Sequence, residues 1–391
     1  MTPDQLKLFI SGAFGSEADA QEVSKLLSPY LAAALIEVRA LIELLPDESL
    51  VREKLWTEML PQVEQAFVPY AANVATILQQ QLPVSGVRAM EETLESLRSA
   101  GIRAVGALRP VDVIADSNKY FLSTKINDKR VVDMLVSEYG PPPLAKSSRH
   151  MVDSIVRGGI ITGDTTENIG KKLRSELPKR LQSQQKAIAR TAIQDYNRQV
   201  KEDVWKNNQD AISRLGLKYE WVAALDSRTC PTCAPLDGQV KGKKKDFPLT
   251  PVHVNCRCTV VIVDPEDPAQ IRTAQVISEE PLEGQGTYKT KKKVNGKAYF
   301  RQNRALQPVN GRSPSYADWL ADLSRQDDLA SRQTLAEFFG GGEAGAGRAD
   351  SFRKAVRGDK EPREALIELT LKPNRNKPLR RFRPNKSYTA L

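Results

Sequence analysis

All four cysteines of the chain lie between positions 230 and 258, as the pairs Cys230/Cys233 and Cys256/Cys258. His253, one of only two histidines, stands three residues before the second pair. A CxxC pair places two thiolates on one turn, and a loop that brings in a second pair completes the tetrahedral set that zinc prefers. We therefore predict a structural zinc site made from four of these five side chains. A three-residue step closes a turn more comfortably than a two-residue step, which favours His253 with Cys256 over Cys258, but the set of four cysteines stays open.

Three other uses of these residues compete with structural zinc. A redox CxxC of the thioredoxin kind needs a βαβ context, whereas the sequence before Cys230 predicts helices. Disulfides between the two halves are stereochemically possible. A catalytic zinc needs an open position and a general base. The nearby Asp226 begins a DSRT run typical of a turn capped by its own aspartate, and Asp237-Gly238 is a hairpin signal. We predict no catalytic residue.

The composition limits the class of protein. The 391 residues are 40% hydrophobic and 27% charged, which allows a sizeable core and two or three domains. No stretch approaches the roughly 18 apolar residues of a membrane span. The start, MTPDQLKLFISG, lacks the basic and apolar regions of a signal peptide. Four cysteines in so long a chain indicate a reducing compartment rather than a disulfide scaffold.

The net charge is +10, and two segments, 286–304 and 372–386, are strongly basic and contain no acidic residue. Such segments bind phosphates or acidic protein surfaces with strong salt dependence. A solvated basic tail is the alternative. The side chains expected to contact nucleic acid or an acidic partner are Lys289, Lys291, Lys292, Lys293, Lys297, Arg301, Arg304, Arg375, Lys377, Arg380, Arg381 and Arg383.

Helical periodicity predicts a hairpin of two helices over 17–45 and 49–82. Prolines are expected to kink or interrupt these helices at Pro29, Pro61 and Pro69. Three consecutive prolines at 141–143 form a rigid joint and indicate a domain boundary.

After the joint, the sequence predicts helices first and strands second. The expected helices are one from Ser147 to Val156, one capped by Asp164 or Thr165 and closing near Pro178, and one from about 180 to 214. The expected strands, which carry the cysteine turns at their ends, are 218–225 and 258–263. Beyond Pro265 the chain is expected to be irregular up to the basic segment 286–304. Two short helices are expected within 313–339, followed by a flexible linker, GGGEAGAG, at 340–347.

These patterns predict a mainly α protein with a small α+β domain. We expect a helical N-terminal region over 1–140 and a central domain of helices and a β-hairpin with a zinc-knuckle-like site over 147–263. An extended basic C-terminal region with short helices is expected over 265–391.

Several motifs of the central region occur together in an order and spacing that resembles a known family. IVRGGIITGDTTENIGKKL precedes AIARTAIQDYNRQV, and YEWVAALDSRTCPTCAPLDGQV and PVHVNCRCTVV follow. The pair Arg190-Thr191, Trp221, the DSRTC run and the HxxCRC ending carry the resemblance. Over about 147–263 the chain resembles the phage Mu F-like minor head proteins, also called phage head morphogenesis proteins. It departs from them at Ala192, usually Glu, and at Val254, often Pro.

The resemblance implies a minor head protein of a tailed phage, made in the host cytoplasm and incorporated into the virion head at the portal vertex. The implied partners are the portal protein, the major capsid or scaffolding protein and packaged double-stranded DNA, without a membrane and without a settled enzymatic activity. One alternative is a head-carried enzyme or toxin with its activity in residues 265–391. Another is a nucleic-acid-binding protein outside any virion. Because 265–391 contains no His or Cys, we favour binding over catalysis.

Overall fold

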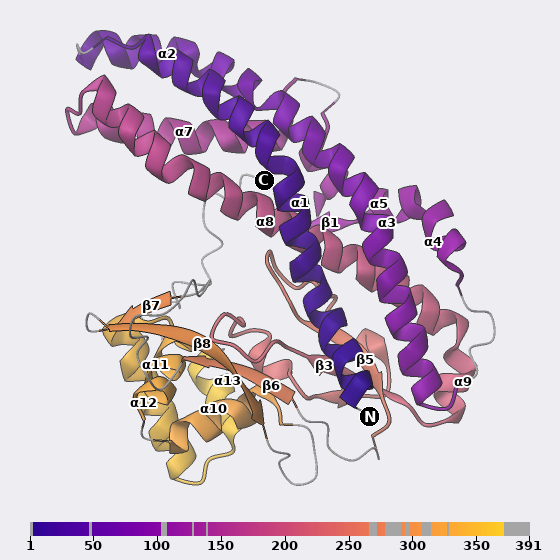
Figure 1. The fold of residues 1–391 in the computed structure, drawn as a ribbon. Coiled ribbons are helices and arrows are strands. Elements are labelled where there is room, and N and C mark those ends of the chain that lie inside the picture. Colours follow the sequence, from indigo (N-terminus) through magenta and orange to yellow (C-terminus); the bar gives the residue numbers. More distant parts are fainter. Residues whose placement is uncertain are drawn as a thin grey trace.

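A computed structural model describes residues 3–46, 49–102, 108–126, 129–137, 140–265, 272–277, 291–294, 297–306, 314–326 and 328–370. Long helices form one elongated bundle, and strands and shorter helices form a smaller lobe beside it (Figure 1). The described part is mostly helical with small antiparallel sheets, as predicted. Among the described residues, no helix is long and apolar enough to cross a membrane.

The N-terminal helices form the predicted hairpin. Helix α1 (Pro3–Glu43) runs antiparallel to α2 (Ser49–Ala66) and α3 (Val68–Ser99), and it packs on both (Figure 1). The predicted interruption at Pro61 is wrong, because this proline lies inside α2. Pro29 lies inside α1, so it does not split off a first short helix. The break falls at Phe67, and Pro69 stands in the first turn of α3, where its missing N–H costs no helical hydrogen bond.

A second hairpin, α7 (Pro143–Ile161) and α8 (Thr166–Asn207), packs across the first. The Thr165 hydroxyl accepts from the Asn168 N–H and caps α8, as predicted. The predicted end near Pro178 is wrong, because this proline lies inside α8, which is 42 residues long. Buried leucines on both sides of the proline keep one face against the core, and this packing outweighs the roughly 3 kcal/mol that an interior proline costs. These leucines are Leu173, Leu177 and Leu181.

Short elements connect the two hairpins and follow the second. They are α4 (Pro110–Ala115), α5 (Ser117–Ser123), β1 (Lys125–Ile126), β2 (Lys129–Arg130), α6 (Val131–Leu135) and α9 (Gln209–Arg214). One hydrophobic core extends from Ala20 to Ile262. It includes residues on both sides of the prolines 141–143, and three of the cysteines.

The small sheet has the strand order β4-β3-β5, with both pairings antiparallel. It consists of β3 (Lys218–Val222), β4 (Val240–Lys241) and β5 (Thr259–Val263). The strands predicted over 218–225 and 258–263 are confirmed as β3 and β5. Trp221 lies opposite Val260, and both are buried against the helices. Val222 pairs with Thr259, so the last residue of β3 and the first residue of β5 lie side by side at one end of the sheet.

A second antiparallel sheet has the order β6-β8-β7, and its first strand lies in the segment that was predicted to be irregular. Its strands are β6 (Arg272–Ile277), β7 (Lys291–Val294) and β8 (Lys297–Leu306). Val294 pairs with Lys297 across the dipeptide Asn-Gly, a strong hairpin signal. The first basic segment is therefore partly a β-hairpin.

Four helices form a C-terminal lobe with its own core. They are α10 (Tyr316–Arg325), α11 (Leu329–Phe338), α12 (Gly342–Arg357) and α13 (Pro362–Thr370). The two short helices predicted within 313–339 are confirmed. The flexible linker predicted at 340–347 is wrong, because α12 begins at Gly342. A Cβ on Gly345 would lie 2.7 Å from the Ala336 carbonyl oxygen, so this glycine allows close packing rather than mobility.

Candidate metal centre

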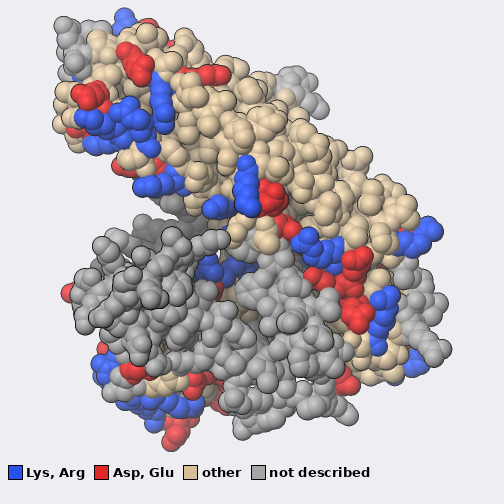
Figure 2. Space-filling view, viewed as in Figure 1, with Lys and Arg blue, Asp and Glu red and all other residues tan. Residues whose placement is uncertain are grey.

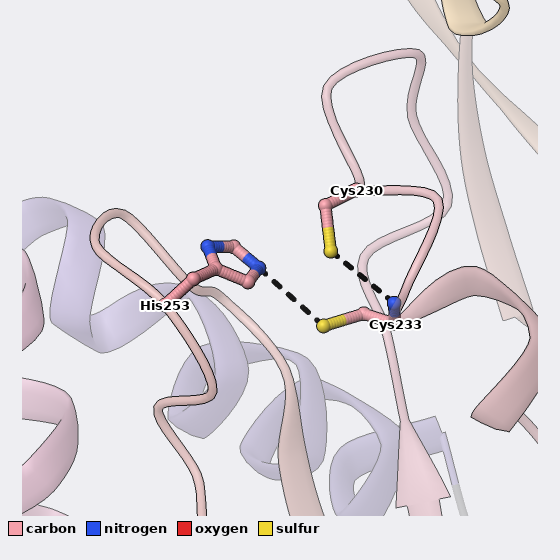
Figure 3. A group of neighbouring side chains, drawn as sticks. All are labelled: Cys230, Cys233 and His253. Carbon is pink, nitrogen blue, oxygen red and sulfur yellow. Dashed lines mark hydrogen bonds between the residues drawn. The ribbon is translucent and has the colours of Figure 1, made fainter. Parts of the chain in front are cut away.

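Two loops at one end of the strands of the β4-β3-β5 sheet bring the cysteines and His253 together. Cys230 and Cys233 lie in the turn after β3 that leads into η1 (Ala234–Leu236), and the other three residues precede β5. Because β3 and β5 are antiparallel, the loop that follows β3 and the loop that precedes β5 lie at the same end of the strands. Figure 3 shows Cys230, Cys233 and His253 directed toward one another from the two loops.

Cys233 lies at the centre of the cluster. Its Sγ is 3.4 Å from His253 Nε2 and 4.0 Å from Cys256 Sγ, and its backbone N–H donates to Cys230 Sγ over 3.2 Å. Two sets of three ligand atoms lie within 4.8 Å of one another, and both contain Cys233. They are Cys230/Cys233/His253 and Cys233/Cys256/Cys258. The five predicted side chains therefore form a cluster that could hold a metal ion.

The thiols are free and shielded from water. Cys233, Cys256 and Cys258 are buried and Cys230 is partly buried. Hydrogen bonds from Cys233 and His253 lower the pKa of Cys230 to about 5, against the effect of burial. Burial lowers the pKa of His253, but its contacts with Cys230 and Cys256 outweigh this and raise it to about 11. The cluster thus favours the thiolate, the form of cysteine that binds metals, at Cys230 and at Cys256, whose pKa is lowered chiefly by a hydrogen bond from Cys233. The pKa of Cys233 is raised, because its thiol hydrogen-bonds to the neighbouring sulfurs.

Helix α8 positions the second ligand loop through Arg190 and Thr191. The Asn255 N–H donates to Thr191 Oγ1 over 3.0 Å, and Arg190 Nη1 donates to Asn255 Oδ1 over 2.5 Å. Asn255 has a φ of 64°, a conformation that asparagine tolerates better than most residues. His253 Nδ1–H donates to the Val254 carbonyl over 2.8 Å, which leaves Nε2 directed at Cys233.

Asp226 joins the two loops. Its carboxylate accepts two bonds of 2.6 Å from Arg257, which stands between Cys256 and Cys258. It also accepts from the Arg228 backbone N–H over 2.9 Å, the turn expected from DSRT. Burial would raise the pKa of Asp226, but the hydrogen bonds and charges of Arg257 and Arg228 lower it to about 2. The carboxylate is therefore a fixed anion between two guanidinium groups.

Asp237 attaches the C-terminal lobe to the first cysteine turn, a role that its sequence context does not indicate. Its fully buried carboxylate accepts from the Ala223 N–H over 2.5 Å and from the Tyr316 N–H over 2.6 Å. Its carbonyl accepts from Arg363 over 2.8 Å. The Tyr316 hydroxyl donates to the Asp226 carbonyl over 2.6 Å. The segment around the first cysteine pair thus also binds the C-terminal lobe, through Asp226 and Asp237 on either side of that pair.

The structure describes the backbone of some of the basic residues predicted to contact nucleic acid or an acidic partner, and others lie outside the described residues. Backbone positions in β7 and β8 are described for Lys291, Lys292, Lys293, Lys297, Arg301 and Arg304. Lys289 and the C-terminal set, Arg375, Lys377, Arg380, Arg381 and Arg383, lie outside the described residues. Their role in binding stays a prediction.

Comparison with known families supports the resemblance seen in the sequence. A family model described as "Phage Mu protein F like protein" matches residues 150–261. The matched segment contains most of α7, all of α8, strands β3 and β4, the first part of β5 and all five residues of the cluster. Comparisons with curated proteins and with solved structures found no match.

Proposed function

We propose that this protein, whose residues 150–261 belong to the phage Mu protein F like family, is a minor head protein of a tailed phage that acts in head assembly. The family match carries this proposal. The protein acts by binding the portal at its vertex, the capsid interior and packaged DNA. The basic segments are the DNA-contacting or acidic-partner-contacting parts, because closely spaced lysines and arginines neutralise phosphates.

A binding role without catalysis agrees with how the carboxylates near the cluster are used. A general base must be able to reach the proton that it removes. Asp226 is held by two arginines, and Asp237 accepts two buried backbone N–H groups. Both are therefore engaged in holding the loops together.

The donor set also supports a structural zinc ion. Zinc bonds of about 2.3 Å to sulfur and 2.0–2.1 Å to nitrogen separate ligand atoms by about 3.8 Å for two sulfurs and about 3.6 Å for sulfur and nitrogen. The distances of 4.0 Å and 3.4 Å from Cys233 are close to these values. We propose Cys230, Cys233, His253 and Cys256 as ligands, with Cys258 as a buried thiol at the start of β5. When bound, the ion cross-links the two loops.

Metal analysis of matched variants tests the zinc proposal. The purified chain should contain about one zinc, Cys256→Ser should lose it, and Cys258→Ser should keep it. If Cys258→Ser loses the metal while His253→Ala keeps it, the ligands are the four cysteines. A chain with no metal and four reactive thiols would contradict a zinc site altogether.

Co-purification with the portal protein tests the function. The chain, co-expressed with portal and capsid proteins, should co-purify with portal or heads. Rising salt should weaken the electrostatic share of this binding, which the basic segments contribute. Alanine at Lys291, Lys292 and Lys293 should reduce this salt dependence. A chain that binds DNA but never associates with heads would instead be a nucleic-acid-binding protein outside the virion. A chain with hydrolytic activity in 265–391 would favour the head-carried enzyme.

A further inference from the structure

The exposed side of the first half of α8 carries a row of lysines. Lys172, Lys179 and Lys186 follow one another at seven-residue steps, and all three are exposed. Seven residues make almost two helical turns, so these three residues, the lysine row, lie on one face over about 21 Å. Residues 177–194 contain four basic residues and no Asp or Glu. This half of α8 lies along the border of the bundle (Figure 1), where Figure 2 shows lysine and arginine atoms at the surface.

Uncharged polar side chains stand between the lysines. Ser175, Gln182 and Ser183 are exposed, and each stands three residues from one lysine of the row and four from the next. In a helix such residues are neighbours on one face, so these side chains border the row. Hydroxyl and amide groups donate hydrogen bonds to phosphate oxygens, as lysines do. The face therefore combines the groups that contact a nucleic-acid backbone.

The acidic residues near the row are already paired with basic residues of α8. These pairs are Asp164 with Lys172, Glu167 with Lys171 and Glu176 with Arg180. Within the described part of the chain, no ion pair involves Lys179 or Lys186. The ammonium groups of these two lysines can thus bind an anionic partner without first breaking an ion pair.

The lack of exposed apolar side chains favours nucleic acid over an acidic protein as this partner. No large hydrophobic side chain of α8 is exposed, and the nearest in sequence are Ile161 and Leu215, outside the helix. Protein interfaces have a core of apolar and aromatic side chains, whereas protein–DNA interfaces are more polar and much more positive. We propose that the lysine row binds the phosphate backbone of double-stranded DNA. This proposal rests on the DNA-binding part of the proposed function and adds a contact surface outside the two basic segments.

Fluorescence anisotropy of a labelled DNA duplex with the full chain, measured over a salt series, tests the proposal. Each phosphate contact contributes about 0.9 to the slope of log K against log salt concentration. Lys179→Gln with Lys186→Gln should therefore reduce that slope by about 1.8 and weaken binding at least about tenfold near 0.1 M salt. The loss should be the same for duplexes of different sequence, because phosphates carry no sequence information. Since both lysines are exposed, thermal unfolding should be unchanged.

Two further double variants control for net charge and for the position of the charge. Lys54→Gln with Lys354→Gln removes two exposed lysines from α2 and α12, and it should leave the slope near that of the wild type. Lys179→Arg with Lys186→Arg keeps both charges in the row and should retain binding.

Three results would overturn the proposal. One is a wild-type chain that does not bind the duplex, and another is a glutamine variant of the row with the wild-type slope. The third is a glutamine variant that binds DNA normally but no longer co-purifies with the portal protein, which would assign the row to that protein. Incorporation into heads is measured separately. A chain that binds DNA through the row but never associates with heads would contradict the role in head assembly and leave the row as a DNA-binding surface.

Discussion

Replacing Asp237 with alanine should detach the C-terminal lobe from the first cysteine turn. The carboxylate of Asp237 is fully buried and accepts from two backbone N–H groups, those of Ala223 and Tyr316. Alanine removes both acceptors and leaves two buried donors without these partners. Each unsatisfied buried donor costs about 1–3 kcal/mol, so we expect a loss of about 4 kcal/mol. Asparagine keeps one acceptor but turns its NH₂ toward the other donor, so we expect about half of that loss.

Hydrogen exchange measured by mass spectrometry tests this prediction at the affected amides. A cost of about 4 kcal/mol corresponds to roughly a thousandfold faster exchange at Tyr316 when exchange occurs through detachment of the lobe. Amides in the middle of α1 should not change. The control is Asp350→Ala in the same lobe, where the side chain is exposed. If Asp237→Ala exchanges at Tyr316 as slowly as the wild type, the carboxylate does not hold the lobe and our reasoning is wrong.

Three further substitutions test the loops and the helical hairpin. The pKa of Asp226 is lowered from 3.8 to about 2, so its ionised form contributes about 2 kcal/mol above pH 4 and this contribution disappears as the pH falls toward 2. In urea unfolding, Asp226→Asn should therefore be less stable than the wild type at pH 7 and converge with it near pH 2. Thr191→Val removes the acceptor of the Asn255 N–H and should cost about 1–3 kcal/mol and lower metal affinity, whereas Thr191→Ser should retain both. A Cβ on Gly159 would lie 2.5 Å from Ile169 Cγ1, while one on Gly158 meets nothing within 4 Å. Gly159→Ala should thus lower the melting temperature, and Gly158→Ala should keep or raise it.

The sequence predicts those features that depend on local pattern. Apolar residues at helical spacing locate α1, because burial of residues such as Val23 and Leu27 determines which face meets the core. Short spacings likewise predict the ligand cluster, because CxxC and HxxC each close within one turn. The alternation of residues along 218–225 and 258–263 predicts β3 and β5, and pairing of these two strands brings the two turns to one end of the sheet.

Features that depend on distant contacts are not predictable in this way. Pro178 looks like a helix end, and only the packing on both sides of it shows why α8 continues. Asp237 looks like part of a hairpin turn, yet its partner Tyr316 lies 79 residues away. Thr191 holds Asn255 from 64 residues away. No local pattern encodes such pairs. The Asn-Gly dipeptide between β7 and β8, in contrast, is a local signal from which that hairpin is predictable.

Quantitative mass spectrometry of purified phage heads tests whether this protein is a component of the head. Heads assembled in cells that express this chain with its portal and capsid proteins should contain it at a fixed low ratio to the portal protein. That ratio should persist through high-salt washing of intact heads, since the protein is incorporated during assembly. Heads that lack the chain while the cells contain it in folded, soluble form would contradict its assignment as a minor head protein.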